Sequence, residues 1–408
     1  MTNATAARPF LQTVPVILVA GCLIAVLNGG PRSTMGFFLT PMSSEQGWGR
    51  EIFALAIAIQ NLVWGIGQPF VGMLADRFGT ARVLVGGSLL YALGLVLMAN
   101  TSDPVTLQMT AGVLIGLGIA GSAFMLVMAA FGRLLPEHMR PLAYGLGTSG
   151  SSVGQFIFAP LGQAFIQAYG WQTALTIMAA IVLAIPVFSC AVRGKPAAMA
   201  VAPGKSDQSI PEALREAFSH GSYRLLVLGF FVCGFQVAFI MIHLPPYLAD
   251  AGIPAAYGGY ALALIGLFNI IGSISAGVLS GRMPRRWILA AIYFGRSLVI
   301  LGFILVPISI ASVLIFSVLM GVLWLSTVPP TQQLVAIMFG TRYMATLFGF
   351  VFLSHQIGSF FGVWLGGFLY DRTGSYDVVW WLSVALGIFA AIVHMPIVEK
   401  QVARPALA

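Results

Sequence analysis

The chain has 408 residues, of which 59% are hydrophobic and only 8% are charged. A water-soluble protein of this length needs more charged side chains than this to solvate its surface. The composition therefore excludes a soluble enzyme and predicts an integral membrane protein. The formal net charge of +8 does not indicate a nucleic-acid partner, because the positive residues lie scattered in short loops between apolar segments.

Twelve apolar segments follow one another along the chain, and a helix needs about 20 apolar residues to cross the hydrocarbon core of a bilayer. The sequence therefore predicts an all-α integral membrane protein with twelve transmembrane helices. The first segment is too long for the core of a signal peptide and has no A-x-A cleavage pattern, so we expect it to be retained. The expected spans lie near 12–38, 52–75, 83–100, 105–131, 142–167, 172–192, 224–249, 258–280, 287–306, 309–338, 344–369 and 377–396.

One long polar stretch, residues 193–223, divides these segments into six and six. We therefore expect a six-helix bundle over 1–192, a cytoplasmic linker over 193–223 and a second six-helix bundle over 224–408. Within the linker, Ser209 and Glu212 have the spacing of a helix-capping box ahead of the amphipathic sequence EALREAF. This pattern predicts a short helix on the membrane surface, with a regulatory role as the alternative.

The distribution of lysine and arginine predicts the orientation of the chain. With the N-terminus in the cytoplasm, Arg50 and Arg372 are the only loop cations that fall outside, so both termini and the linker are expected to be cytoplasmic. We expect a multi-pass protein of the cell inner membrane. The sixteen cations placed inside are Arg8, Arg77, Arg82, Arg133, Arg140, Arg193, Lys195, Lys205, Arg215, Arg224, Arg282, Arg285, Arg286, Arg342, Lys400 and Arg404.

The two halves of the sequence resemble each other at an offset of half the chain. The pattern Gly72-x-Leu74-x-x-Arg77 recurs as Gly277-x-Leu279-x-x-Arg282, and several glycines recur at the same offset. Such an internal repeat predicts two parallel six-helix halves. Halves of this kind enclose a substrate site near the middle of the bilayer and open it to each side in turn.

The segment GMLADRFGTAR, which starts at Gly72 and follows the second span, closely resembles the loop signature of the major facilitator superfamily. The resemblance implies the major facilitator fold. It also implies a cytoplasmic gate in which Asp76 accepts charge-assisted hydrogen bonds; the alternative is that these charges only set topology. The gating residues are expected to be Gly72, Asp76, Arg77, Arg82 and, from the second copy, Arg282. The arginine that drug/proton antiporters carry in the fourth span is absent, since Gly112 stands there.

Two further stretches are similar to particular branches of this superfamily. The first span contains Pro31-Arg32-Ser33-x-x-x-Phe37-Phe38, similar to the monocarboxylate porters, whose substrate- and proton-linked lysine falls on Arg32. The eleventh span is similar to the oxalate/formate exchangers, whose lysine falls on His355. In the eighth span Asn269 is kept, but Ser273 stands where both groups carry an arginine, which weakens the case for a second carboxylate contact.

The intramembrane charges point to an anion independently of any resemblance. None of the twelve acidic residues lies in the middle of a span, whereas Arg32 and Arg296 do. A charge at this depth is costly and persists when it lines a cavity or finds a partner. Without a buried acid, the expected partner is an anionic substrate or a ring of backbone carbonyls. Arg32 could instead form a structural bond near the outer side, and Arg296, on a peripheral helix, could be structural.

Other candidate substrate-binding residues lie near these positions: Asn28, Gln356 and His243 join Arg32, Asn269, His355 and Arg296. His355 and His243 are also candidates to carry a proton, because histidine titrates near neutral pH. No metal-binding spacing and no GxxxxGK[ST] motif occurs, so neither a metal, another cofactor nor ATP is expected.

The sequence thus predicts a monomeric secondary transporter, not an enzyme, that moves a small organic anion, a monocarboxylate, together with protons by alternating access. Alternatives within the same fold are an anion exchanger and an exporter of a small amphipathic compound. A membrane-embedded enzyme or sensor that uses His355 and His243 is the alternative of another class.

Overall fold

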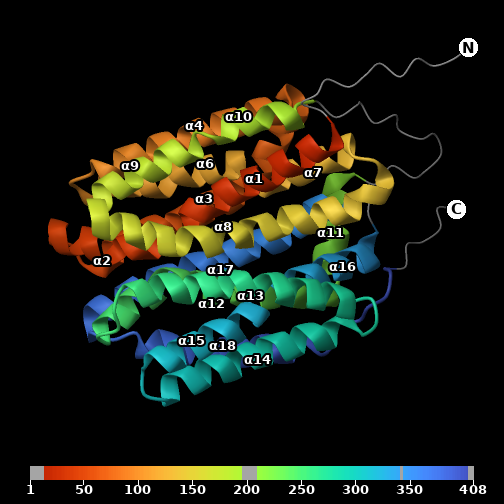
Figure 1. The fold of residues 1–408 in the computed structure, drawn as a ribbon. Helices are drawn as coiled ribbons and strands as arrows, with labels where there is room; N and C mark the ends of the chain where they lie inside the picture. Colours follow the sequence, from red (N-terminus) through yellow and green to blue (C-terminus); the bar gives the residue numbers. More distant parts are fainter. Residues whose placement is uncertain (1–12, 195–208, 341–342, 403–408) are drawn as a thin grey trace, which may run out of the picture.

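The computed structural model describes residues 13–194, 209–340 and 343–402. Within these ranges every regular element is a helix, and the long helices run side by side along one axis (Figure 1). Helix α1 begins and helix α18 ends at the same end of the bundle, called here the termini end. The opposite end, where α2 ends and α3 begins, is called the far end.

The helices of the first half are α1 (Val14–Ser33), α2 (Met35–Gln46), α3 (Arg50–Phe78), α4 (Thr80–Ala99), α5 (Pro104–Leu107), η2 (Gln108–Leu114), α6 (Ile115–Ser122), α7 (Phe124–Leu134), η3 (Glu137–Met139), α8 (Arg140–Tyr169), α9 (Trp171–Val182), α10 (Ile185–Ser189) and η4 (Cys190–Val192). Those of the second half are α11 (Ile210–Ser219), α12 (Gly221–Asp250), α13 (Ala256–Leu279), α14 (Arg285–Leu305), α15 (Ile310–Leu323), α16 (Val328–Phe339), α17 (Met344–Thr373) and α18 (Asp377–His394).

The twelve-helix prediction is confirmed. Eleven of the described segments are long and apolar enough to cross a membrane. The twelfth, α8, is a helix of 30 residues whose Gly- and Ser-rich sequence makes it less apolar. Helix α8 packs against both α1 and α13, and its glycines permit the close approach: a Cβ at Gly154 would lie 2.6 Å from the Val26 carbonyl oxygen of α1.

Several predicted spans are interrupted. The first breaks at Thr34, after Pro31, and the Thr34 hydroxyl donates to the Pro31 carbonyl at 2.7 Å. The fourth breaks at Ala123, whose backbone is extended. The tenth breaks between Leu323 and Val328. Each break frees backbone groups that must find partners, and within a membrane these come from neighbouring helices.

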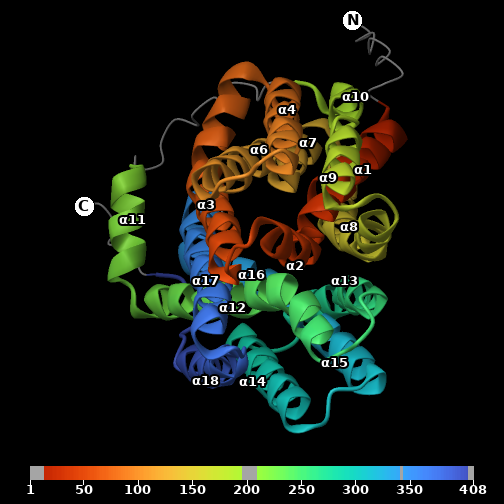
Figure 2. The same cartoon turned by 90° about the vertical axis from the view of Figure 1, so that its left-hand side faces the viewer.

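Figure 2 shows α1–α10 on one side of the molecule and α12–α18 on the other. The two groups meet along the pairs α3 with α17, α8 with α13, and α2 with α12. Glycine permits the close approach of α2 and α12: a Cβ at Gly36 would lie 2.6 Å from the Met241 carbonyl oxygen. The interface between the groups is therefore tightly packed at this point.

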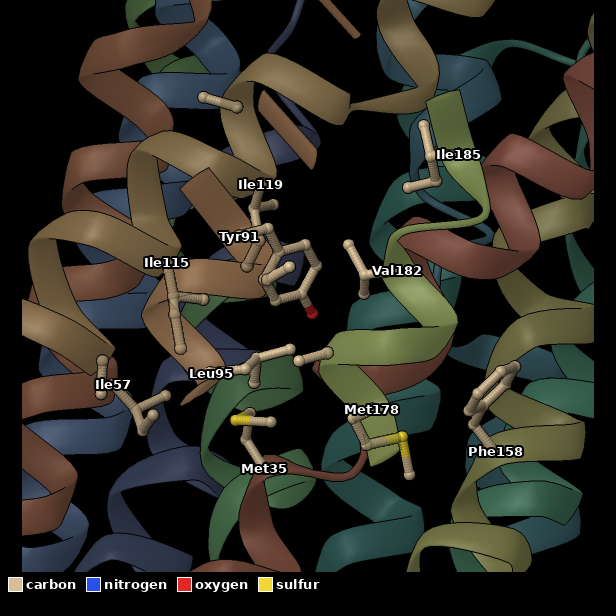
Figure 3. Close-up of a cluster of buried hydrophobic side chains, with 14 of the residues drawn as sticks. Met35, Ile57, Tyr91, Leu95, Ile115, Ile119, Phe158, Met178, Val182 and Ile185 are labelled. Atoms are coloured by element: carbon tan, nitrogen blue, oxygen red, sulfur yellow. The ribbon is translucent and has the colours of Figure 1, made fainter. Parts of the chain in front are cut away.

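The interior of the first half is apolar (Figure 3). Ile57 of α3, Leu95 of α4, Ile119 of α6 and Val182 of α9 are completely or almost completely buried there. Since lipid is as apolar as these side chains, the packing stabilises the bundle through van der Waals contact more than through removal from water.

Helix α11 has the predicted capping box. The Ser209 hydroxyl accepts from the Glu212 amide at 3.4 Å, and the Glu212 carboxylate accepts from the Ser209 amide at 2.7 Å. These hydrogen bonds hold the pKa of Glu212 below its usual value. The helix lies along the outside of the bundle (Figure 2), as a short surface helix should.

Candidate functional site

Arg32 lies in the last turn of α1, just before the break at Thr34, and its side chain reaches α3. Its Nη2 donates to Oδ1 of Asn61 at 3.0 Å, and its guanidinium lies over the Trp64 ring at 4.6 Å from the centroid. Among the residues that the structure describes, no carboxylate forms an ion pair with it. The cation is thus held by one amide oxygen and one aromatic face.

A small cavity adjoins Arg32 at the boundary between the two halves. Its volume is about 10 Å³, which is room for roughly one water molecule. The first half contributes the polar wall, and α12 of the second half contributes an apolar wall. The lining residues are Arg32, Met35, Ile57, Gln60 and Asn61 from the first half and Ala238, Met241 and Ile242 from the second.

His355 and Gln356 lie on α17, across the interface from α3. Gln356 Nε2 donates to the backbone carbonyl of Asn61 at 3.2 Å, and its Oε1 lies 3.0 Å from His355 Nδ1. The His355 ring stacks on Phe352 and contacts Phe230. The structure therefore connects Arg32 to His355 through Asn61 and Gln356, although His355 is not among the residues that line the cavity.

Asn269 joins the halves at a different point. Its Nδ2 donates to the Ser152 hydroxyl of α8 at 2.8 Å, and its Oδ1 accepts from the Leu325 amide at 2.9 Å. Ser273, which replaces the arginine of the similar families, donates to the same Oδ1 at 3.1 Å. Asn269 thus supports the break in the tenth span and lies outside the cavity lining.

Asn28 and His243 also lie away from the cavity and have structural partners. Asn28 donates to Ser122 at 2.7 Å inside the first half. His243 is fully buried, with Nε2 at 2.8 Å from the Val363 carbonyl oxygen and Nδ1 at 3.3 Å from the Tyr376 hydroxyl. These contacts satisfy the polar atoms of both side chains within their own half of the protein.

Arg296 is fully buried within the second half. Its Nε and Nη2 donate to the Leu323 carbonyl at 2.9 and 2.8 Å, and Nη2 also donates to the Trp324 carbonyl. Nη1 donates to Gln236 at 3.4 Å. The tenth-span break exposes these carbonyls, so the geometry matches the carbonyl ring considered for this arginine and leaves it no direct route to the cavity.

The far end carries an ionic network that the sequence analysis did not assign to the site. Arg50 forms a bidentate ion pair with Asp250, both bonds measuring 2.7 Å. The Asp371 carboxylate accepts the backbone amides of Arg50 and Glu51 at 2.9 and 2.8 Å, so α17 caps the N-terminus of α3. Arg372 pairs with Glu51 at 3.4 Å. Every one of these bonds joins one half to the other.

The sequence contained a signal for this network. Arg50 and Arg372 are the only loop cations placed on that side, and acidic residues stand next to both of them. What the sequence could not show is that residues about 320 positions apart, such as Glu51 and Asp371, are neighbours.

Comparison with known proteins identifies the family of the chain. The family model of the Major Facilitator Superfamily matches residues 21–363. The chain belongs to the major facilitator superfamily. It is 26% identical over 400 residues to the uncharacterized MFS-type transporter YcxA of Bacillus subtilis, covering 95% of this chain and 96% of YcxA. It is 26% identical to monocarboxylate transporter 12-B of Danio rerio (77% and 72% covered) and to monocarboxylate transporter 4 of Rattus norvegicus (81% and 71% covered).

Solved structures show the same fold. A bacterial homologue of the human lysosomal transporter Spinster, in an inward-facing unoccupied conformation, superposes with a TM-score of 0.77 at 15% identity, covering 98% of this chain and 100% of that one. The D-xylose-proton symporter superposes with a TM-score of 0.73 at 13% identity, covering 95% and 98%. This chain is therefore a multi-pass membrane protein with the major facilitator fold, and its relatives are transporters.

The superfamily loop signature lies at the termini end, where its charged side chains are exposed. Asp76, Arg77, Arg82 and Arg282 all face outward. Arg82 makes a local bond to the Phe78 carbonyl at 3.4 Å, and Asp76 lies near enough to Arg133 to interact electrostatically. A Cβ at Gly72 would meet nothing within 4 Å. None of the contacts described here for these charges joins one half to the other, unlike the ionic bonds at the far end.

Proposed function

We propose that this protein is a proton-coupled secondary transporter of a small monocarboxylate. The observation that carries the proposal is Arg32: a cation at the boundary between the halves, beside a cavity and with no carboxylate partner among the described residues. An intramembrane charge needs compensation, and an anionic substrate supplies it.

The surroundings of Arg32 favour one carboxylate attached to an apolar body. Arg32 is the only charged residue that lines the cavity, and the opposite wall is formed by Ala238, Met241 and Ile242. Ser273 bonds to Asn269 and supplies no second charge. A dicarboxylate would leave its second charge unpaired at this depth, which is costly. The similarity to monocarboxylate transporters 12-B and 4 supports the same substrate class.

We assign the proton to His355. No acidic residue lies mid-span, and His355 is linked to Arg32 through Gln356 and Asn61. Histidine changes charge near neutral pH and is therefore suited to proton exchange between two aqueous sides. An anion exchanger, an exporter of a small amphipathic compound, and a membrane-embedded enzyme or sensor remain as outcomes that the experiments below distinguish.

Transport is proposed to proceed by alternating access between bundle 1–192 and bundle 224–408, joined by linker 193–223, with the termini end in the cytoplasm. The ionic network at the far end supports a state closed toward the outside. The exposed loop-signature charges at the termini end support a gate that is open toward the cytoplasm in the same state.

The test uses purified protein and a thermal-shift panel of acetate, butyrate, lactate, benzoate, oxalate and succinate, since a ligand of the native state raises its melting temperature by mass action. Butyrate or benzoate should stabilise the wild type more than succinate does. Arg32→Ala should lower affinity by about 30- to 700-fold, on the basis of roughly 2 to 4 kcal/mol for a buried charged contact. Arg32→Lys should retain part of the affinity.

Arg215→Ala is the matched control, because Arg215 is exposed on α11 and belongs neither to the expected gate nor to the cavity lining. It should bind like the wild type. Equal affinity of Arg32→Ala and wild type would contradict the anion site, and stabilisation by neutral amphipathic compounds in both variants would favour export of such compounds. Counterflow in proteoliposomes that requires an anion on both sides and ignores pH would favour exchange.

A further inference from the structure

A second hydrogen bond of Asn61 fixes how its side-chain amide faces Arg32. Asn61 is almost completely buried, at 2% exposure. Its Nδ2 donates to the Ile57 carbonyl one helical turn earlier, at 2.9 Å. This bond uses the amide nitrogen and turns Oδ1 toward Arg32. Oδ1 accepts a hydrogen bond from Arg32 Nη2 at 3.0 Å. The amide oxygen therefore stands where one oxygen of a carboxylate would bind a guanidinium.

The cavity beside this contact is too small for an organic anion. It has room for roughly one water molecule, whereas the smallest panel member, acetate, has four heavy atoms. The Trp64 ring covers one face of the guanidinium. A substrate carboxylate can reach Arg32 only if a neighbouring group moves, and Asn61 holds the hydrogen-bonding position that the anion requires.

We propose that Asn61 is an internal competitor for Arg32, which the substrate carboxylate displaces when it binds. This inference rests on the proposed function and deepens it. Without substrate, the hydrogen bond to the Asn61 amide oxygen offsets part of the free-energy cost of burying the Arg32 charge. The amide supplies no negative charge. A substrate must therefore offer a better acceptor than an amide. Neutral compounds with carbonyl groups gain little over Asn61, whereas a carboxylate gains a full charge interaction. Asn61 thus sets affinity and selects anions.

Asn61 also contacts the other half of the protein. Its backbone carbonyl accepts from Gln356 Nε2 at 3.2 Å, next to the point where Gly65 of α3 packs on the Gln356 side chain. The residue whose side chain the substrate displaces is therefore also a residue that joins α3 to α17. Asn61 takes part both in substrate binding and in the contact between the halves.

The proposal predicts opposite effects for two substitutions of one residue. Asn61→Ala removes the competitor, so benzoate and butyrate should bind about 10-fold tighter or more. Asn61→Asp places a permanent carboxylate on Arg32, so the same anions should bind at least about 100-fold more weakly. A purely structural role for Asn61 would weaken binding in both variants. Affinity is measured by calorimetry with each anion on purified full-length protein, and the ligand-free melting temperature is recorded.

Gln108→Ala is the matched control, because Gln108 also bonds to α3 through its side-chain amide, donating to the Ile52 carbonyl at 3.1 Å, but does not line the cavity. It should change affinity less than about 3-fold, well under the effect of a lost charged contact. If Asn61→Ala does not fold, Asn61→Leu keeps the branched shape of the side chain without its amide and gives the same expectation.

The outcomes separate this inference from the proposed function. Loss of anion binding in Arg32→Ala, together with weaker or unchanged binding in Asn61→Ala or Asn61→Leu, overturns the competitor role and leaves the anion site standing. Absence of any carboxylate binding to the wild type overturns both. Tighter binding in Asn61→Ala and weaker binding in Asn61→Asp support both.

Discussion

The carboxylate of Asp371 is expected to hold the far end closed. It accepts two backbone amides at the start of α3, at 2.9 and 2.8 Å, and lies beside the positive end of that helix. Asp371→Asn keeps the shape of the side chain but removes its charge and leaves one amide facing a nitrogen donor. Hydrogen bonds to charged groups contribute about 1.5 to 3 kcal/mol, which corresponds to roughly a 10- to 150-fold shift toward the state open at the far end.

The assay is a spin-label distance measurement in proteoliposomes, with labels at Ser44 in the last turn of α2 and at Ala255 just before α13, two exposed residues on opposite halves. Cys22, Cys190 and Cys233 are replaced by alanine in this background. The wild type should give one short distance, and Asp371→Asn should add a longer one.

Asp377→Asn is the control for this experiment, because Asp377 begins α18 at the same end and its amide bonds to Ser375 within its own half. It should leave the distance distribution unchanged. Suppose that Asp371→Asn has the wild-type distance distribution and that the double variant Arg50→Ala, Asp371→Asn has it too. The far-end network then does not control opening.

Three further predictions concern the gate, the proton and the buried arginine. Asp76→Asn should slow uptake into proteoliposomes severely at near-normal expression, and full uptake would remove its gating role. Wild-type uptake should rise as external pH falls from about 8 to 6, and His355→Gln should flatten that profile more than it lowers affinity, whereas an unaltered profile would move the proton to His243 or the substrate. Arg296→Met should leave the Leu323 and Trp324 carbonyls unpaired, at about 1 to 3 kcal/mol each, and lower the melting temperature. Arg296→Met should not change benzoate affinity. Weaker benzoate binding in this variant would place Arg296 in the substrate path.

The sequence by itself determined the membrane-spanning architecture. Transfer of a segment into lipid depends on its own composition, so apolar segments could be found one by one without knowledge of their neighbours. The same holds for the α11 capping box, whose partners Ser209 and Glu212 are three residues apart. The superfamily loop signature at Gly72 was also readable, because its residues are contiguous.

Only the tertiary structure distinguished Arg32 from Arg296. In the sequence both are mid-span arginines without an acidic partner. In the fold, carbonyl oxygens freed by the break after Leu323 accept hydrogen bonds from Arg296. Arg32 instead donates to one amide oxygen and lines a cavity. Likewise, the bonds from Asp371 to the start of α3 join residues about 320 positions apart. Hydrogen bonds require atoms within about 3.5 Å, and which distant segments come that close is decided by helix packing rather than by local composition.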